Sequence, residues 1–223
     1  GAPVSLQWDE RGLIVEVAQD RLTGEVRMVA WMNEASLAAT RETGFATFFS
    51  RSRGELWQKG ATSGNRLRVL SVTADCDGDT LLLAVDPEGP SCHTGRSSCF
   101  FKPLDEASRE LPPILVDLES AIAARASSTA SESYTRSLLD GGAPQIGAKL
   151  TEEAAELAAA IASESDERVI AESADVLFHL LVGLRSRQVA LREVLHELAR
   201  RVGTSGHAEK RSRGPGGGGP QQV

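Results

Sequence analysis

Residues 102–113 read Lys-Pro-Leu-Asp-Glu-Ala-Ser-Arg-Glu-Leu-Pro-Pro, and this stretch divides the chain into two halves of different composition. Its three prolines and mixed charges oppose both a continuous helix and a central strand. Short β-type runs alternate with turns before it, and the sequence after it is rich in alanine and leucine. We therefore expect a first domain over residues 1–103, a linker over 104–117, a second domain over 118–203 and a flexible tail over 204–223.

The first half has the pattern of an α+β domain that is rich in strands. Runs of β-branched and apolar residues alternate with turn residues, and Asn33 follows one run, where its side chain can cap a short helix through Thr40. The residues Asp77-Gly78-Asp79 are typical of a tight turn between two strands. We expect strands over residues 13–18, 26–32, 45–50, 68–74 and 80–85.

The second half has the pattern of an all-α helical bundle. Residues 114–139 predict a helix that is broken or loosened near residues 125–129. Gly141-Gly142-Ala143-Pro144 predicts a helix end followed by a new start. Two further helices are expected over about residues 166–187 and 191–202. The helix expected between Pro144 and the helix that begins at about residue 166 carries one apolar stripe, which consists of Ile146, Leu150, Leu157 and Ile161.

The composition is that of an ordinary globular protein. The chain has 223 residues, a hydrophobic fraction of 41% and a formal net charge of −7, which opposes a nonspecific nucleic-acid binder because such a protein needs a basic surface. We expect no signal peptide and no membrane-spanning segment, since neither pattern is present. Three cysteines cannot all pair with one another, so we expect metal binding in a reducing cytoplasm.

All three cysteines and three carboxylates fall within one short segment. It begins with Asp75-Cys76-Asp77-Gly78-Asp79 and ends with Cys92-His93-Thr94-Gly95-Arg96-Ser97-Ser98-Cys99. If the strand continues through the first motif, its aspartates lie on one face and Cys76 on the other. Clustered carboxylates favour Mg²⁺, whereas three thiolates favour zinc and leave a fourth position for water, as in a catalytic site. His93 is a candidate proton carrier beside this site.

Simpler interpretations of these residues compete with the two metal sites. A turn rich in aspartate is often only solvated, and three cysteines with a fourth ligand can form a structural zinc site. A loop histidine often has no catalytic role. The combination of the motifs, in this order, favours the two metal sites.

Acidic side chains in the second half form a separate candidate site. At about 100° per residue, one arc of a helix carries Lys149, Glu152, Glu153 and Glu156. One narrow face of the next helix carries Glu172, Asp175 and His179. That helix is apolar nearly all round and is expected to be largely buried, where carboxylates are costly unless paired or bound to metal. Mg²⁺ between the helices could bind a polyphosphate. The alternative is a set of surface glutamates in helical salt bridges.

The motifs of the first half resemble the phosphoribosyl-AMP cyclohydrolase family, which opens an adenine ring in histidine biosynthesis. The resemblance rests on the aspartate motif and on Cys92 to Phe100, and it extends from about Val15 to Phe101. The segments that support it are residues 31–34, 49–57 and 59–65.

This resemblance implies a set of metal ligands and an obligate homodimer with composite sites. Zinc would be bound by Cys76 of one subunit together with Cys92 and Cys99 of the other. Mg²⁺ would be bound by a second set, which consists of Asp75, Asp77 and Asp79.

The resemblance also implies a substrate with two phosphoribosyl groups. Arg51 and Arg53 are candidates for gripping phosphate through their forked donors, unless this segment is only a solvated, charged hairpin. The expected substrate-binding residues are Asn33, Ser50, Arg51, Ser52, Arg53, Lys59, Thr62, Ser63 and Asn65.

The second half resembles the phosphoribosyl-ATP pyrophosphohydrolase family over about Leu118 to Arg201. The resemblance rests on the motifs at residues 133–138, 149–156 and 172–179, which related helical nucleotide pyrophosphatases share. It implies an all-α fold. The implied Mg²⁺ ligands are Glu153, Glu156, Glu172 and Asp175, with Glu152 as an accessory.

Together the two resemblances predict a bifunctional, cytoplasmic hydrolase of histidine biosynthesis that needs Zn²⁺ and Mg²⁺. Its partners would be phosphoribosyl nucleotides and a second copy of the chain, without nucleic acid or membrane. Two alternatives are a housecleaning nucleotide pyrophosphatase with a zinc-stabilised dimerisation domain, and a nonenzymatic zinc-stabilised binding module with a helical dimerisation domain.

Overall fold

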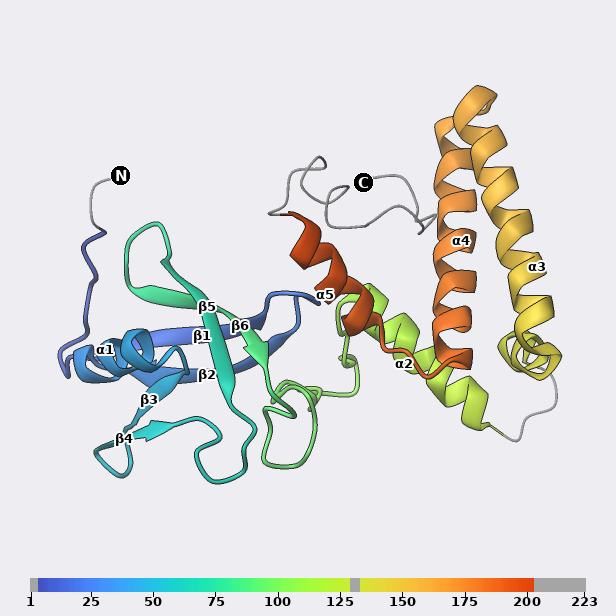
Figure 1. Cartoon of the computed structure of the whole chain (residues 1–223). Helices are drawn as coiled ribbons and strands as arrows, with labels where there is room; N and C mark the ends of the chain where they lie inside the picture. Colours follow the sequence, from blue (N-terminus) through green and yellow to red (C-terminus); the bar gives the residue numbers. More distant parts are fainter. Residues whose placement is uncertain (1–3, 129–132, 203–223) are drawn as a thin grey trace, which may run out of the picture. The chain divides into compact units, whose positions relative to one another are not determined.

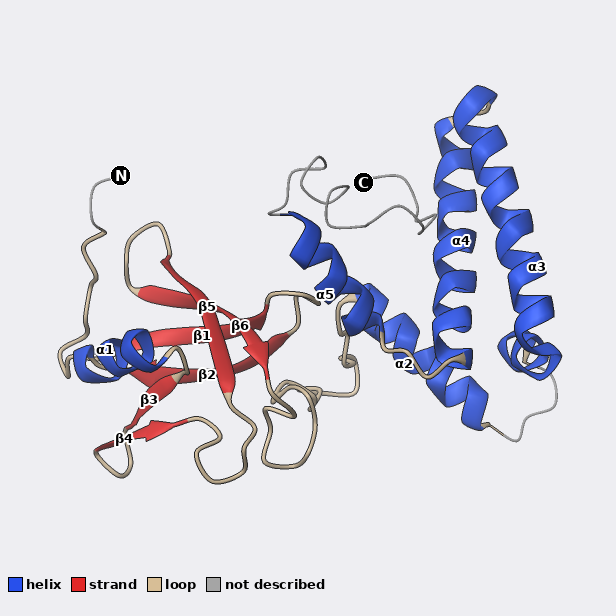
Figure 2. Cartoon of the chain, viewed as in Figure 1, coloured by secondary structure: helices blue, strands red, loops and turns tan. Residues whose placement is uncertain are grey.

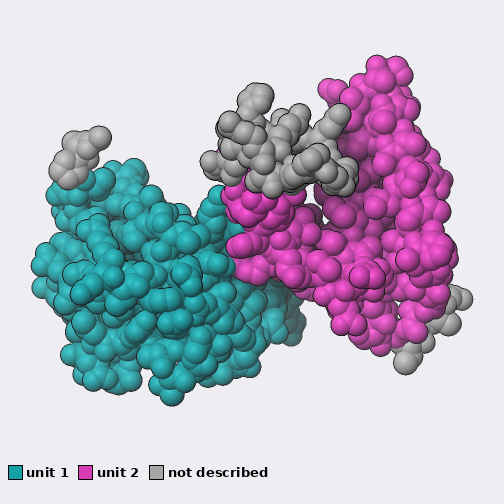
Figure 3. Space-filling model, viewed as in Figure 1, with its two compact units in different colours: residues 1–113 teal, residues 114–223 magenta. Residues whose placement is uncertain are grey.

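The computed structural model describes residues 4–128 and 133–202, and the chain divides into two compact units (Figures 1 and 3). The first unit extends from Gly1 to Pro113 and the second from Ile114 to Val223. Strands occur in the first unit, and the second is built from helices (Figure 2). This confirms the predicted class of each half. The flexible tail predicted over residues 204–223 lies outside the described residues.

The first unit is built around a four-stranded mixed sheet in the order β2-β1-β6-β5. Its central strand β1 pairs antiparallel with β2 and parallel with β6, while β5 and β6 form an antiparallel hairpin. A separate antiparallel pair is formed by β3 and β4. The strands are β1 (Ile14–Asp20), β2 (Val26–Met32), β3 (Thr47–Ser50), β4 (Glu55–Gln58), β5 (Leu67–Ala74) and β6 (Thr80–Pro87).

A short helix, α1 (Glu34–Thr43), follows β2 and is capped at both ends. The Asn33 side chain accepts a hydrogen bond from the Ser36 backbone N–H at 2.8 Å, and the Ser36 hydroxyl accepts one from the Asn33 N–H at 2.9 Å. This reciprocal capping box confirms the predicted cap. Leu37 and Thr40 are buried on the inner face of α1.

The core of the first unit lies on one face of β1. Alternate residues of this strand are buried, as the period of a strand requires. One of them, Glu16, is 0% exposed, and neither of its carboxylate oxygens has a hydrogen-bond partner of good geometry among the described residues. This burial raises the pKa of Glu16 to about 8. Its apolar neighbours in the core include Ile14, Ala18, Met28 and Met32.

The second unit contains α2 (Ile114–Ser127), α3 (Tyr134–Ser163), α4 (Asp166–Ser186) and α5 (Leu191–Val202). Long segments of α3 and α4 lie side by side (Figure 1). Within α3, Gly142 has φ 69° and ψ −168°, so the helix is kinked there, and Pro144 begins the next segment. The structure thus has the stop and restart that the sequence predicted. The core of this unit consists of Ile122, Leu138, Ile146, Leu181, Val182 and Leu191.

One expectation about the helices is wrong for the single chain. The apolar residues all round α4 predicted a largely buried helix, yet Ile170 is 69% exposed and Leu177 is 45% exposed. Ile161, the last residue of the predicted stripe on α3, is 67% exposed. The α3–α4 hairpin extends beyond the core of its own unit, so one chain does not cover all of its apolar surface. Among the described residues, no helix has the length and apolar character that crossing a membrane requires.

Candidate functional site

Three carboxylates gather in the turn between β5 and β6. One oxygen each from Asp75, Asp77 and Asp79 lies within 4.8 Å of the others. The strand ends at Ala74, so the expectation of alternating strand faces is wrong. The aspartates meet because Asp75 Oδ1 accepts hydrogen bonds from three backbone N–H groups of the turn, those of Gly78 at 3.0 Å, Asp79 at 3.1 Å and Thr80 at 3.2 Å.

The charges of this acidic turn act on one another. The pKa of Asp77 is raised, first by the negative charge of Asp79 and then by that of Asp75. Loss of part of its hydration acts to raise the pKa of Asp75, but hydrogen bonds with the Thr80 and Gly78 backbones and with the other aspartates lower it below its usual value. A divalent cation would relieve this repulsion. The carboxylate oxygens of the turn are the ligand type that Mg²⁺ prefers.

Only glycine fits at position 78 of the acidic turn. Gly78 has φ 79°, and a Cβ placed there would lie 2.5 Å from the carbonyl oxygen of Ser5. The Gly78 carbonyl in turn accepts a hydrogen bond from Gln7 at 2.8 Å. The N-terminal segment therefore packs directly against the turn and fixes its shape.

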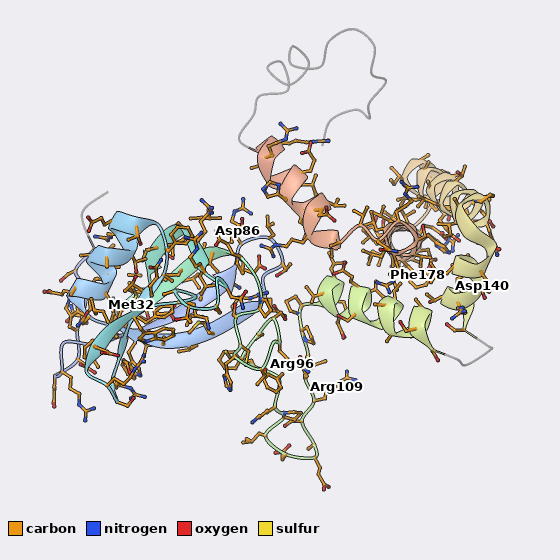
Figure 4. The ribbon with its side chains drawn as sticks, turned by 60° about the horizontal axis from the view of Figure 1, so that its bottom comes forward. Met32, Asp86, Arg96, Arg109, Asp140 and Phe178 are labelled. Carbon is orange, nitrogen blue, oxygen red and sulfur yellow. The ribbon has the colours of Figure 1, made fainter. Side chains whose placement is uncertain are left out.

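Two of the three thiols are held by one loop, residues 91–99. Its backbone closes through hydrogen bonds from Ser91 to Ser97 at 3.2 Å and from Cys92 to Arg96 at 3.1 Å. The Cys99 N–H donates to the Arg27 carbonyl at 2.9 Å, which ties the end of the loop to β2. This cysteine loop includes Arg96, which is labelled in Figure 4 and forms an ion pair with Glu110 at 2.7 Å.

The two thiols of the cysteine loop interact with each other and differ in acidity. A hydrogen bond from Thr94 lowers the pKa of Cys92, and the Cys99 side chain and the charge of Lys59 add to this effect. Burial raises the pKa of Cys99, as does the neighbouring Cys92 thiol. His93 is exposed, with Nδ1 4.0 Å from the Cys92 sulfur. These thiols suit a soft cation such as zinc.

Cys76 is not part of this pair within one chain. It is exposed and lies in the acidic turn, and no group of three metal-binding side chains in the described part of the chain contains a cysteine. One chain therefore brings together Cys92 and Cys99 but leaves Cys76 apart.

Arg27 supports the cysteine loop from β2. Its guanidinium group donates to the Ser91 hydroxyl at 3.0 Å and to the Gly89 carbonyl at 2.8 Å, and it pairs with Glu25 at 3.0 Å. Arg27 is only 7% exposed. A buried guanidinium group with several acceptors is a rigid support for the loop that carries the thiols.

An open cavity of about 490 Å³ lies beside the hairpin of β3 and β4. The Arg51 guanidinium stacks on Trp31 at 4.6 Å from the ring centre, which leaves its N–H edge available to an anion. Arg53 instead pairs with Glu55 at 3.4 Å. The cavity is lined by Arg11, Ala30, Trp31, Phe49, Ser50, Arg51, Ser52 and Trp57.

The other predicted substrate-binding residues occupy different environments. The Asn33 side-chain oxygen caps α1. Lys59 Nζ lies 5.9 Å from the centre of the Trp57 ring, and its charge helps to lower the pKa of Cys92 and opposes the rise in the pKa of Cys99. Thr62 and Ser63 lie in an exposed turn, and the Ser63 hydroxyl accepts a hydrogen bond from the Asn65 N–H at 3.2 Å.

The second unit has its own acidic cluster. Oxygens of Glu153, Glu156 and Glu172 lie within 4.8 Å of one another across α3 and α4. Asp175 is exposed one turn along α4 and is near enough to raise the pKa of Glu172. Glu152 is exposed and pairs with Lys149 at 2.8 Å.

Glu172 is the most deeply buried carboxylate of the cluster, at 3% exposure. Its pKa is raised, first by burial and then by Glu156 and Asp175, while Arg168 acts in the opposite direction. Arg168 Nη2 lies 2.5 Å from Glu172 Oε1. The cluster thus combines several carboxylates, the ligand type that Mg²⁺ prefers, and Arg168 and Lys149 offset part of their mutual repulsion while no metal is bound.

Sequence reasoning left several residues of these sites without a role. Arg11, Trp31 and Trp57 line the cavity, although both tryptophans fall within segments that carried the resemblance. Near the acidic cluster, Tyr134 and His179 form a hydrogen bond that connects α3 with α4. Both belong to quoted motifs, but their spacing of 45 residues gives no sign of contact.

Comparison with known proteins places each unit in a class of hydrolases. Residues 28–101 match the family model of phosphoribosyl-AMP cyclohydrolase, and residues 115–202 match that of phosphoribosyl-ATP pyrophosphohydrolase. The order of the two matches is the order of the strand-rich and helical units. The chain is therefore a hydrolase with two activities.

Curated relatives match nearly the whole chain. The histidine biosynthesis bifunctional protein HisIE of Caldanaerobacter subterraneus is 42% identical over 196 residues, which cover 88% of this chain and 96% of the relative. The protein of the same name from Wolinella succinogenes is 41% identical over 219 residues, covering 93% and 96%. That from Pyrococcus furiosus is 43% identical over 201 residues, covering 88% and 95%.

This chain belongs to the family of bifunctional histidine-biosynthesis proteins that join the cyclohydrolase to the pyrophosphohydrolase. One reaction hydrolyses phosphoribosyl-ATP to phosphoribosyl-AMP and pyrophosphate. The other opens the adenine ring of phosphoribosyl-AMP. The family membership favours this function over the two alternatives that the sequence left open.

Proposed function

We propose that ring opening occurs at a zinc site shared between two copies of the chain. Cys92 and Cys99 of one copy would bind the metal together with Cys76 of the other. The observation that carries this proposal is the separation of the thiols, because one chain pairs Cys92 with Cys99 and leaves Cys76 in the acidic turn. Bound zinc would supply a water molecule of lowered pKa as the nucleophile. We expect about one zinc per chain.

The residues around this site would bind and orient phosphoribosyl-AMP. His93, exposed beside Cys92, is the candidate for carrying a proton to or from the purine ring. The acidic turn, formed by Asp75, Asp77 and Asp79, would bind Mg²⁺. A cation there would neutralise charge on the substrate.

We assign the phosphate-binding role in the first unit to the cavity around Arg51. The Ser50 and Ser52 hydroxyl groups lie 3.4 Å apart at its edge, and the Arg51 guanidinium is held against Trp31. Arg11 adds a second guanidinium to the cavity lining. Arg53, Lys59, Thr62, Ser63, Asn33 and Asn65 remain candidates for the rest of the substrate.

The acidic cluster of the second unit would bind Mg²⁺ for the hydrolysis of phosphoribosyl-ATP. Its ligands would be Glu153, Glu156 and Glu172, with Asp175 completing the set and Glu152 as an accessory. The metal would hold the polyphosphate oxygens and orient a water molecule. Arg168 is close enough to contribute positive charge beside the phosphates.

A homodimer is consistent with features of both units. The composite zinc site needs two copies, and Ile161, Ile170 and Leu177 present apolar surface on the α3–α4 hairpin. Three free thiols in one chain suit the reducing cytoplasm, where we place the protein.

Mixing two inactive variants tests the shared zinc site. Cys76→Ser and Cys92→Ser chains should each lack cyclohydrolase activity. After mixing by unfolding and refolding, half of the dimers contain both variants, and each of these has one intact site out of two. Activity should therefore return to roughly one quarter of the wild-type value.

The matched control mixes Cys92→Ser with Cys99→Ser. Both changes affect the same half of the site, so every site stays damaged and no activity should return. Zinc content of each mixture should follow the same pattern. If the first mixture stays as inactive as its parents while refolded wild type recovers, the shared site is wrong.

A further inference from the structure

The side chains of Tyr134 and His179 form a hydrogen-bonded pair next to the acidic cluster of the second unit. The Tyr134 hydroxyl lies 2.9 Å from His179 Nε2, and His179 Nδ1 lies 2.8 Å from the backbone carbonyl oxygen of Asp175. His179 is only 4% exposed. Its ring also contacts Phe178, whose ring stacks on Tyr134 at 6.1 Å (Figure 4 labels Phe178).

These contacts determine how the neutral ring of His179 is protonated. The Asp175 carbonyl can only accept, so the proton of the neutral imidazole is on Nδ1. Nε2 is then an acceptor, and the Tyr134 hydroxyl donates to it. Both ring nitrogens of a buried histidine are thereby satisfied, and the ring has one orientation.

The kink in α3 brings Tyr134 to this place. Tyr134 begins α3, and Glu153 lies 19 positions later, a distance of about 28 Å along a straight helix. The break at Gly142 turns the first segment of α3, which includes the labelled Asp140, away from the long segment (Figure 4). The start of α3 can then reach His179 on α4.

The pair lies directly beside a carboxylate of the cluster. His179 Nδ1 is 4.0 Å from Glu153 Oε1, and Lys149 Nζ is 3.6 Å from the same oxygen. Tyr134 is close enough to Lys149 to affect its pKa, which is raised first by a hydrogen bond to Glu152. The Glu153 side chain is 12% exposed. Its orientation is therefore bounded by His179 on one side and Lys149 on the other.

We propose that Tyr134 and His179 are positioning residues for the pyrophosphohydrolase site. His179 packs against Glu153 and binds the backbone of Asp175, while Tyr134 holds the imidazole in the orientation that makes both contacts. The pair thus fixes carboxylates from α3 and α4 relative to each other before the metal binds. This proposal rests on the assignment of Mg²⁺ to the acidic cluster. Residues that orient metal ligands typically affect metal affinity by about 10- to 100-fold.

Substitutions that remove this hydrogen bond test its effect on catalysis. Tyr134→Phe removes only the hydroxyl, and His179→Asn keeps a donor near Asp175 but cannot reach Tyr134. Each should raise the Mg²⁺ concentration for half-maximal pyrophosphohydrolase activity by about tenfold. Because both break the same bond, the double variant should be no worse than the worse single variant. Excess Mg²⁺ should restore much of the rate.

The chain provides two controls for this experiment. His196 is exposed on α5, so His196→Asn should not change the Mg²⁺ requirement. Cyclohydrolase activity of the same samples should stay at the wild-type level, which shows that the first unit is intact and that the effect is confined to the second. An unchanged Mg²⁺ requirement in both Tyr134→Phe and His179→Asn would overturn the proposal.

Metal binding can also be followed without turnover, because Tyr134 is the only tyrosine in the chain. Chain labelled with 3-fluorotyrosine should give one ¹⁹F resonance that shifts when Mg²⁺ is added. The shift should persist in Asp77→Asn, which alters the acidic turn of the first unit, and disappear in Glu156→Gln. In His179→Asn it should need about tenfold more Mg²⁺.

These outcomes separate the inference from the function on which it rests. If Glu156→Gln leaves both pyrophosphohydrolase activity and Mg²⁺ binding intact, the metal assignment of the second unit is wrong. If Glu156→Gln abolishes both but the Tyr134 and His179 variants behave like wild type, only the positioning role is wrong.

Discussion

The backbone N–H of Cys99 donates to the carbonyl oxygen of Arg27 at 2.9 Å, while the side chain of the same arginine bonds to Ser91 and Gly89. One residue of β2 therefore holds both ends of the cysteine loop. The loop contains no helix or strand and has few backbone hydrogen bonds of its own, so we expect the spacing of its two thiols to depend in part on this arginine.

Replacing Arg27 by glutamine should loosen the cysteine loop. The variant loses the donors to Ser91 and Gly89 and should bind zinc about 10- to 100-fold more weakly, because residues that support metal ligands have effects of this size. Zinc content after dialysis and cyclohydrolase activity should both fall, while pyrophosphohydrolase activity should not change. Arg41→Gln, at an exposed arginine of α1, is the matched control. Full zinc retention in Arg27→Gln would contradict the supporting role.

Glu16 should make the stability of the first unit depend on pH. Its pKa is about 8 in the folded state, against 4.5 for the ordinary side chain. Between these values the folded state keeps a proton that the unfolded state releases. The free energy of unfolding should therefore fall as pH rises through this window, by up to about 5 kcal/mol.

Glu16→Gln should remove this dependence because glutamine does not ionise. The measurement is urea unfolding at pH 5 to pH 9, followed by tryptophan fluorescence, since Trp8, Trp31 and Trp57 all lie in the first unit. Glu42→Gln, at an exposed position, should keep the wild-type slope. A wild-type slope in Glu16→Gln would show that Glu16 is not the group that titrates.

The acidic turn should not tolerate a side chain at Gly78. In Gly78→Ala the methyl group would meet the Ser5 carbonyl at 2.5 Å, in addition to the strain of a positive φ. Gly12→Ala is a matched control, because Gly12 has φ 71° but open space around its Cβ position. We expect Gly12→Ala to destabilise the first unit by about 1 kcal/mol, and Gly78→Ala to destabilise it further and weaken Mg²⁺ binding. Equal effects in the two variants would argue against the close packing of Ser5 on the turn.

Arg51 should contribute to binding phosphoribosyl-AMP more than to the chemical step. Arg51→Gln removes a guanidinium that is held against Trp31 at the cavity, so KM should rise about 10- to 100-fold with a smaller change in kcat. Steady-state kinetics with phosphoribosyl-AMP measure both constants. A fall in kcat with an unchanged KM would place Arg51 elsewhere in the mechanism.

The sequence predicted the fold class of each half because local patterns carry that information. A run of β-branched and apolar residues identified β1, and the Asn33 cap and the Gly142 break are local signals that the structure reproduces. The parallel pairing of β1 with β6 and the contact of Tyr134 with His179 were not predicted, because each joins segments far apart in the chain. The cavity at Trp31 depends in the same way on the packing of separate strands.

The three aspartates of the acidic turn lie together as the sequence predicted, but not for the reason on which that prediction rested. Strand parity was expected to place Asp75, Asp77 and Asp79 on one face, but the strand ends before them. Their carboxylates converge because the turn folds its N–H groups around Asp75 Oδ1. Ile170 and Leu177 are exposed in the single chain, although the apolar pattern of α4 predicted a largely buried helix. Such a pattern indicates that a helix has apolar surface to cover, but it does not indicate whether the same chain covers it.

The assignment of one reaction to each metal site is tested most directly by identifying the products formed from phosphoribosyl-ATP with Zn²⁺ and Mg²⁺ present. Cys92→Ser should accumulate phosphoribosyl-AMP and pyrophosphate, because only ring opening is lost. Glu156→Gln should leave phosphoribosyl-ATP unconverted but should still open the ring of added phosphoribosyl-AMP. Ring-opened product at the wild-type rate in Cys92→Ser, or pyrophosphate release at the wild-type rate in Glu156→Gln, would contradict the account.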